Sequence, residues 1–244
     1  MRFDRRGDDV PFEDQVSDTF DVLRDLQRQP EIDATRIGLW GFSQGAWIAP
    51  MVASRTDAIR FLVLVASVGV TPAAQMLYAT AKHVRGAGFG EDAAQRAVEA
   101  RRLVDEWRRG NAPIERAQRT VDSLASQPWF DLTYLPRDLA KAGPWPDMDF
   151  DPVPIFAQVK VPVLLFYGED DEWQPIDESV AAWQLAAKRA GNDDVTVVRL
   201  AGTAHAPTLG GRRAIDAVSP EYERTLVTWL ERVTRRAASS RVSP

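Results

Sequence analysis

The chain has 244 residues, of which 45% are hydrophobic and 27% charged, with a formal net charge of -5. These values predict one soluble globular domain with a sizeable core, and without a basic stripe they exclude nucleic acid as an implied partner. The absence of cysteine excludes disulfides and thiolate chemistry, and two histidines argue against a histidine-rich metal site. No apolar run reaches the roughly 18 residues of a membrane span. The first residues lack the apolar core of a signal peptide, so we expect a cytoplasmic protein.

The first 70 residues alternate between strand and helix patterns. Apolar residues recur at helical spacing over 11–29, and the run 61–66 is wholly apolar, as in a strand covered on both faces. The expected elements are the tail of a strand at Arg2-Phe3, a helix at 11–29, a strand at 37–40, a helix at 43–54 and a strand at 61–66.

Residues 71–151 have a different texture, and we interpret them as a mostly helical insert between two strands. Helical patterns cover 73–85, 92–109 and 114–126. An aromatic and proline-rich segment follows, which contains Trp129, Phe130, Tyr134 and Trp145.

The last part of the chain returns to alternation. We expect a strand at 161–167, a helix at 177–190 that stops at Gly191, a strand at 195–200, and a helix capped by Ser219. Strands that alternate with helices predict a parallel sheet with right-handed crossovers, whose active site lies beyond the carboxyl ends of the strands. The core then comprises 1–70 and 152–236, the insert 71–151, and a loose tail 237–244.

The most informative motif is Gly41-Phe42-Ser43-Gln44-Gly45, placed between a predicted strand and a predicted helix. This is the sequence form of a nucleophile elbow, a strained turn that lifts a serine hydroxyl clear of a sheet. We expect both glycines to be required because strand and helix come close together there. The helix start also offers the main-chain N–H of Gln44 where an oxyanion forms.

A serine hydroxyl needs a base, and the base needs an acid to orient it. His205 comes just after the strand 195–200, at the right end of the sheet, whereas His83 falls within a helix of the insert. The acid is expected after the strand 161–167, where the loop Glu169-Asp170-Asp171-Glu172 offers four carboxylates. The order of serine, acid and histidine along the chain is that of one known triad arrangement.

These elements resemble the α/β-hydrolase superfamily, on the branch of bacterial esterases and serine peptidase-like hydrolases. The likeness rests on the segments 37–45, 161–171 and 202–205. The family often has Gly-x-x-Asp-x-x-x-Pro in its acid loop, and Gly168, Asp171 and Pro175 fit that spacing. The resemblance therefore implies Asp171 as the acid, with Asp170 in reserve, and a mostly parallel doubly wound α/β sheet with the insert in place of the family's cap.

The resemblance also implies an eight-strand sheet, of which the strand 37–40 corresponds to the fifth. Nothing in this chain supplies the first three, so the core looks N-terminally truncated, and the loop that carries a second oxyanion donor is missing with them. Three explanations are open: a wrong start or a fragment, closure by Arg2-Phe3 against the elbow strand, or a second subunit that adds a strand in a homodimer.

We expect a serine hydrolase that cleaves carboxylic esters of short to medium acyl length, with Ser43, His205 and Asp171 as the triad. Phe42, Trp129, Phe130 and Trp145 are candidates for a substrate pocket, although simple packing explains most of the insert's aromatic residues equally well. The alternatives are a peptidase or amidase on the same triad, or a weak or inactive hydrolase that serves as a binding protein. A small-molecule ester is the expected partner, and the triad needs no metal or cofactor.

Overall fold

The computed structural model describes residues 7, 10–212 and 214–239. The strand tail predicted at Arg2-Phe3 lies outside the described residues, as does the end of the expected tail, 240–244.

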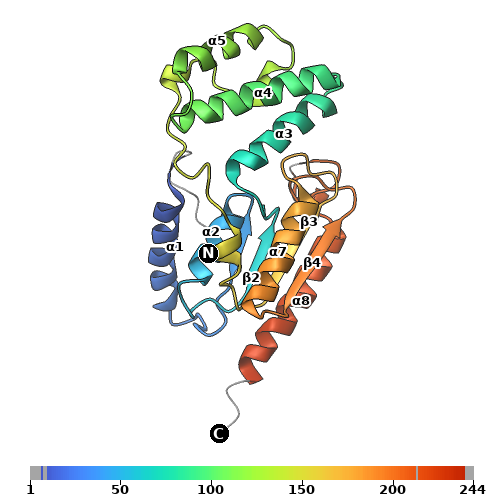
Figure 1. Ribbon diagram of the computed structural model, residues 1–244. Helices are drawn as coiled ribbons and strands as arrows, with labels where there is room; N and C mark the ends of the chain where they lie inside the picture. The colour runs from blue at the N-terminus through green and yellow to red at the C-terminus, as the bar shows by residue number, and fades with distance from the viewer. Residues whose placement is uncertain (1–6, 8–9, 213, 240–244) are drawn as a thin grey trace.

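The described strands form one parallel sheet in the order β1-β2-β3-β4, which confirms the predicted α/β class (Figure 1). The strands are β1 (Leu39–Phe42), β2 (Leu62–Val65), β3 (Val163–Gly168) and β4 (Val195–Leu200). Strands β2 and β3 are buried along their whole length, as their apolar sequences predict. The first strand begins two residues later than the predicted 37–40, so it runs directly into Ser43.

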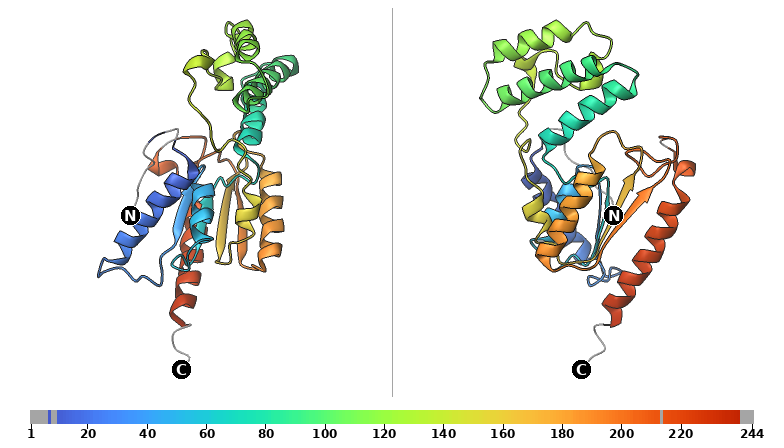
Figure 2. Two further views of the ribbon diagram at one scale, coloured as in Figure 1. Left: turned by 60° about the vertical axis from the view of Figure 1, so that its left-hand side comes forward. Right: turned by 45° about the vertical axis from the view of Figure 1, so that its right-hand side comes forward.

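Helices cover both faces of the sheet (Figures 1 and 2). One face packs against α1 (Phe12–Gln27), α2 (Gly45–Ala53), α6 (Val153–Phe156) and α7 (Ile176–Ala190). The other packs against α8 (Pro220–Ser239), whose Tyr222, Trp229 and Val233 join the alternate residues of β2 and β3 in a second core cluster. The alternation of side chains along each strand thus fills two separate cores, one on each face.

The insert stands above the carboxyl ends of the strands (Figure 1). It contains α3 (Pro72–Gly86), α4 (Glu91–Arg108) and α5 (Ile114–Leu124), with short 3-10 helices η1 (Phe130–Thr133) and η2 (Leu139–Lys141). A separate cluster of buried residues holds these elements together, including Ala97, Val104 and Val121. The insert therefore has a hydrophobic core of its own beside the two cores of the sheet.

Local chemistry explains where several helices begin and end. The Thr71 side chain accepts the N–H of Ala74 and Pro72 occupies the first turn, so α3 starts there. Gly191, in the left-handed conformation, ends α7 as predicted. Helix α8 starts after Ser219, also as predicted, but it continues to Ser239, so the expectation of a loose chain from residue 237 is corrected for residues 237–239. A further 3-10 helix, η3 (Ile215–Ala217), precedes α8.

No helix within the described residues is both long enough and apolar enough to cross a membrane.

Candidate active site

The turn between β1 and α2 holds Ser43 in a strained conformation. Its φ angle is 53°, in the left-handed region that residues other than glycine rarely adopt, at a cost of about 1–3 kcal/mol. The Ser43 N–H donates to the carbonyl of Val65 at 3.0 Å, and the Ser43 carbonyl accepts the N–H of Ala46 at 2.9 Å. Ser43 is therefore fixed by main-chain bonds to β2 on one side and to the first turn of α2 on the other.

The two glycines of the motif differ in how much room they leave for a side chain. A Cβ atom on Gly41 would lie 2.3 Å from the carbonyl oxygen of Gly45, so the strand and the helix start approach too closely for a side chain at position 41. A Cβ atom on Gly45 meets nothing within 4 Å outside its own helical turn. The expectation that both glycines are required for close packing is thus corrected for Gly45.

Two loops bring the histidine and the acid to the same edge of the sheet. The turn after β3 carries Asp171, and the loop after β4 carries His205. These loops touch, because the Asp170 N–H donates to the carbonyl of Thr203 at 3.0 Å. Gly168 makes the approach possible, since a Cβ atom there would lie 2.0 Å from the carbonyl oxygen of Ala204.

The structure brings the three predicted side chains together. His205 Nε2 lies 2.9 Å from Ser43 Oγ, and His205 Nδ1 lies 2.9 Å from Asp171 Oδ2 and 3.1 Å from Oδ1. With the neutral ring protonated at Nδ1, the imidazole donates to the carboxylate and accepts from the hydroxyl. The His205 side chain is 22% exposed, so a reactant can reach the pair formed by Ser43 and His205.

Asp171 has the surroundings that an orienting acid requires. It is buried, and its two carboxylate oxygens accept the main-chain N–H of Trp173 at 2.8 Å and the side-chain amide of Gln174 at 2.7 Å. Asp170, the reserve candidate, is exposed. Of the four carboxylates in this loop, Asp171 is the one that meets His205.

Gln44 is at the N-cap of α2, and its carbonyl accepts the N–H groups of Trp47 and Ile48. The residue directly after Ser43 thus begins a helix, and the start of a helix attracts negative charge.

His83, which sequence reasoning set aside as a residue of the insert, lies close to this site. It is 8% exposed, and its ring packs edge-on against Trp173 with centroids 4.4 Å apart. Burial lowers the pKa of His83 below its ordinary value, against the attraction of the Glu172 carboxylate. A signal was present in the sequence, because His83 follows Ala79 and Thr80 at the spacing of the buried face of α3.

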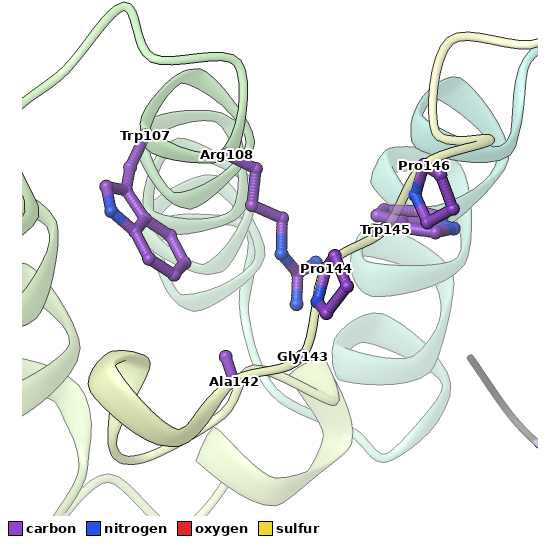
Figure 3. Close-up of a pocket in the computed structure, with 7 residues that line it drawn as sticks. All are labelled: Trp107, Arg108, Ala142, Gly143, Pro144, Trp145 and Pro146. Carbon is purple, nitrogen blue, oxygen red and sulfur yellow. The ribbon is translucent and has the colours of Figure 1, made fainter.

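The residues predicted to line a substrate pocket lie in three different places. The centroid of the Phe42 ring lies 5.1 Å from that of the His205 ring, so Phe42 is next to the three predicted catalytic side chains. Trp129 and Phe130 are buried in the core of the insert, so for them the pocket expectation is corrected in favour of packing. Trp145 lines a hollow of about 410 Å³ at the end of α4, where the Arg108 guanidinium lies 5.4 Å from its ring (Figure 3).

Neither Ser43 nor His205 is among the residues that line this hollow. Within the described residues, no group of three or more histidine, aspartate or glutamate side chains is arranged to hold a metal ion.

A strained serine at a strand-to-helix turn, joined to histidine and aspartate from two later loops of a parallel sheet, defines the α/β-hydrolase class of fold and site. The chain belongs to the alpha/beta hydrolase family, which it matches over residues 1–219.

Solved structures with the same fold include DcsB in complex with its substrate analogue and VinJ. DcsB is 16% identical with a TM-score of 0.52, over 96% of this chain and 75% of that one. VinJ is 18% identical with a TM-score of 0.52, over 91% of this chain and 73% of that one. Acylaminoacyl peptidase from Pyrococcus horikoshii is 17% identical with a TM-score of 0.41, over 80% of this chain but 23% of that one. The comparison with curated proteins finds no match.

Proposed function

We propose that this hydrolase-family protein cleaves carboxylic esters of short to medium acyl length through Ser43, His205 and Asp171. The observation that carries the proposal is the 2.9 Å separation between Ser43 Oγ and His205 Nε2, with Asp171 on the other ring nitrogen at the same distance. The first separation is within the range in which a proton passes from a nucleophile to its base, and the second lets Asp171 orient the imidazole.

In the proposed reaction, Ser43 Oγ attacks the ester carbonyl carbon while His205 Nε2 takes the hydroxyl proton. The negative oxygen of the tetrahedral intermediate accepts a hydrogen bond from the main-chain N–H of Gln44. The intermediate collapses when the bond to the alcohol oxygen breaks, and His205 gives its proton to the departing alcohol. The acyl group then remains on Ser43.

Water completes the cycle. His205 Nε2 takes a proton from a water molecule, whose oxygen attacks the acyl carbon, and the carboxylic acid leaves as Ser43 regains its proton. Asp171 stays ionised throughout, holds the Nδ1–H tautomer and stabilises the imidazolium that forms in each half-reaction. Phe42, beside the imidazole, is the best-placed of the predicted pocket residues to contact the substrate.

A fluorophosphonate probe tests the proposal, because it reacts only with an activated serine. We expect stoichiometric labelling of the wild-type protein and none of Ser43→Ala. Asp171→Asn should lower kcat on p-nitrophenyl butyrate by about 10³- to 10⁴-fold, whereas Asp170→Asn, which changes an exposed carboxylate in the same loop, should leave it unchanged.

Matched substrates decide between ester and amide chemistry. Turnover of p-nitrophenyl esters well above that of aminoacyl p-nitroanilides supports the esterase proposal, and the reverse result favours a peptidase on the same triad. A wild-type protein whose Ser43 resists the probe contradicts the enzymatic proposal and favours a binding role.

A further inference from the structure

The acid Asp171 receives its hydrogen bonds from the residues that directly follow it. The main-chain N–H of Trp173 donates to Oδ1 and the Gln174 side-chain amide donates to Oδ2. A carboxylate that accepts a main-chain N–H two residues later forms an Asx turn, so its orientation depends on where that main chain lies. The position of Trp173 therefore helps to set the direction in which Asp171 faces His205.

The Trp173 side chain is held by the insert. Its ring packs edge-on against His83 of α3 at 4.4 Å and lies 5.1 Å from the ring of Tyr134. Both partners come from residues above the sheet, since α3 rises from its carboxyl end into the insert (Figure 1). Edge-to-face aromatic pairs at such distances are worth about 0.5–1.5 kcal/mol beyond simple burial.

Features of the two partners indicate more than general packing. The buried His83 ring meets the main chain of Leu132 in the insert, and the Glu172 carboxylate lies 3.7 Å from its Nε2. Tyr134 adopts a left-handed φ angle of 55°, a further strained position beside the site.

Trp173 also stands next to the reacting groups, because its ring centroid is 6.0 Å from that of His205. A continuous line of contacts thus runs from His83 through Trp173 to Asp171, and from there through His205 to Ser43.

We infer that Trp173, anchored by His83 of the insert, is a positioning residue that holds Asp171 in its productive orientation. The helical insert takes part in the chemistry through this contact, in addition to covering the site. The inference rests on the proposed function, since it assigns a role to the triad acid.

Removal of the ring tests this role. Trp173→Ala keeps the main-chain N–H but loses the anchor, so the turn relaxes and Asp171 loses its alignment. We expect kcat on p-nitrophenyl acetate and the rate constant for fluorophosphonate labelling to fall about 10- to 100-fold, as for a small misplacement of a reacting group. KM should change little, and Trp173→Phe should restore most of the rate because it keeps an aromatic ring.

The partner in the insert should show the same dependence. His83→Ala should also slow labelling, and the double variant with Trp173→Ala should be no slower than Trp173→Ala alone, because both changes break one contact. Lys82→Ala is the matched control, since it changes the exposed neighbour of His83 in the same helix. We expect it to label at the wild-type rate.

The outcomes separate the two proposals. A wild-type protein that is not labelled contradicts the proposed function and this inference together. A labelled wild-type protein with Trp173→Ala labelled at an equal rate, or with a raised KM and an unchanged kcat, contradicts the inference alone. Thermal unfolding of each variant shows whether slow labelling is caused by loss of the fold. Recovery of the labelling rate in Trp173→Phe then shows that the aromatic ring at this position acts as an anchor for Asp171.

Discussion

At the scale of single residues, the identity of the site follows from spacing, whereas its surroundings do not. The resemblance to the family's acid-loop pattern, which Gly168 and Pro175 fit, selects Asp171 from four consecutive carboxylates, and Asp171 is the one that meets His205. The strained elbow at Ser43 is likewise readable from its motif, because the turn demands particular residues at fixed positions.

The aromatic residues of the insert were harder to predict. Trp129 and Phe130 lie in a segment whose composition suits a pocket as well as a core, and they belong to the core. His83 was assigned correctly to a helix, but the sequence of a helix does not state which distant loop its buried face will meet. The contact between His83 and Trp173 joins residues that are 90 positions apart, so only tertiary structure reveals it.

Gly168 provides a test of how closely the loops that carry Asp171 and His205 must approach. In Gly168→Ala the new Cβ atom would lie 2.0 Å from the carbonyl oxygen of Ala204, so the loop before His205 has to move. We expect the free energy of unfolding to fall by about 1–3 kcal/mol. We also expect kcat on p-nitrophenyl butyrate to fall at least 10-fold. Urea unfolding and steady-state kinetics measure the two effects.

Gly86→Ala is the matched control, because a Cβ atom at the end of α3 meets nothing within 4 Å beyond the helix itself. It should leave the rate unchanged and leave stability unchanged or slightly raised. Wild-type activity in Gly168→Ala would contradict the view that this glycine sets the distance between the loops.

At the scale of elements, periodicity located the helices and strands well because each buries one continuous face or run. The predicted strand 195–200 has the same bounds as β4, and the predicted helix 92–109 differs from α4 by one residue at each end. Periodicity does not reveal that α4 buries charge. Arg101 and Asp105 are both almost fully buried within it, although their side chains are polar.

Burial raises the pKa of Asp105 to about 6, from 3.8, despite the nearby guanidinium groups of Arg101, Arg108 and Arg109. A carboxyl group with a raised pKa in the folded state holds its proton more tightly there than in the unfolded chain. The free energy of unfolding therefore decreases as the pH rises from about 4 to about 6, and this contribution is constant above that window.

The comparison of wild type with Asp105→Asn isolates this contribution. Between about pH 4 and pH 6, the free energy of unfolding of the wild-type protein should fall relative to the variant by up to about 3 kcal/mol. Chemical denaturation at several pH values measures the difference. A difference that does not vary with pH would show that Asp105 titrates alike in the folded and unfolded chains.

At the scale of the whole molecule, the alternation of strands and helices predicts a sheet with helices on both faces. It does not predict what pairs with the outer edge of the sheet. Strand β1 pairs with β2 on one side, and no other described strand pairs with it on the other. The Leu39 N–H donates to the carbonyl of Phe61 on β2. The main-chain groups of Trp40 and Phe42 therefore point the other way, toward the edge that no described strand covers. Trp40 is 54% exposed, although it is only three residues before Ser43.

A strand edge that no described strand covers is a template for pairing, and natural sheets usually protect such edges. We propose that a second copy of the chain covers β1, because two identical edges related by a two-fold axis are complementary to each other. Closure of the sheet would also hold the elbow strand from both sides and so stabilise the strained turn at Ser43.

The oligomeric state tests this proposal. We expect the wild-type protein to be a dimer by light scattering at micromolar concentration. Trp40→Lys, which places a charge on the edge strand in exchange for an indole that donates to the Tyr222 hydroxyl, should shift it to monomer. Leu185→Lys adds the same charge at an exposed apolar position of α7 and should remain dimeric. A monomeric wild-type protein with full esterase activity would show that β1 needs no second copy for catalysis.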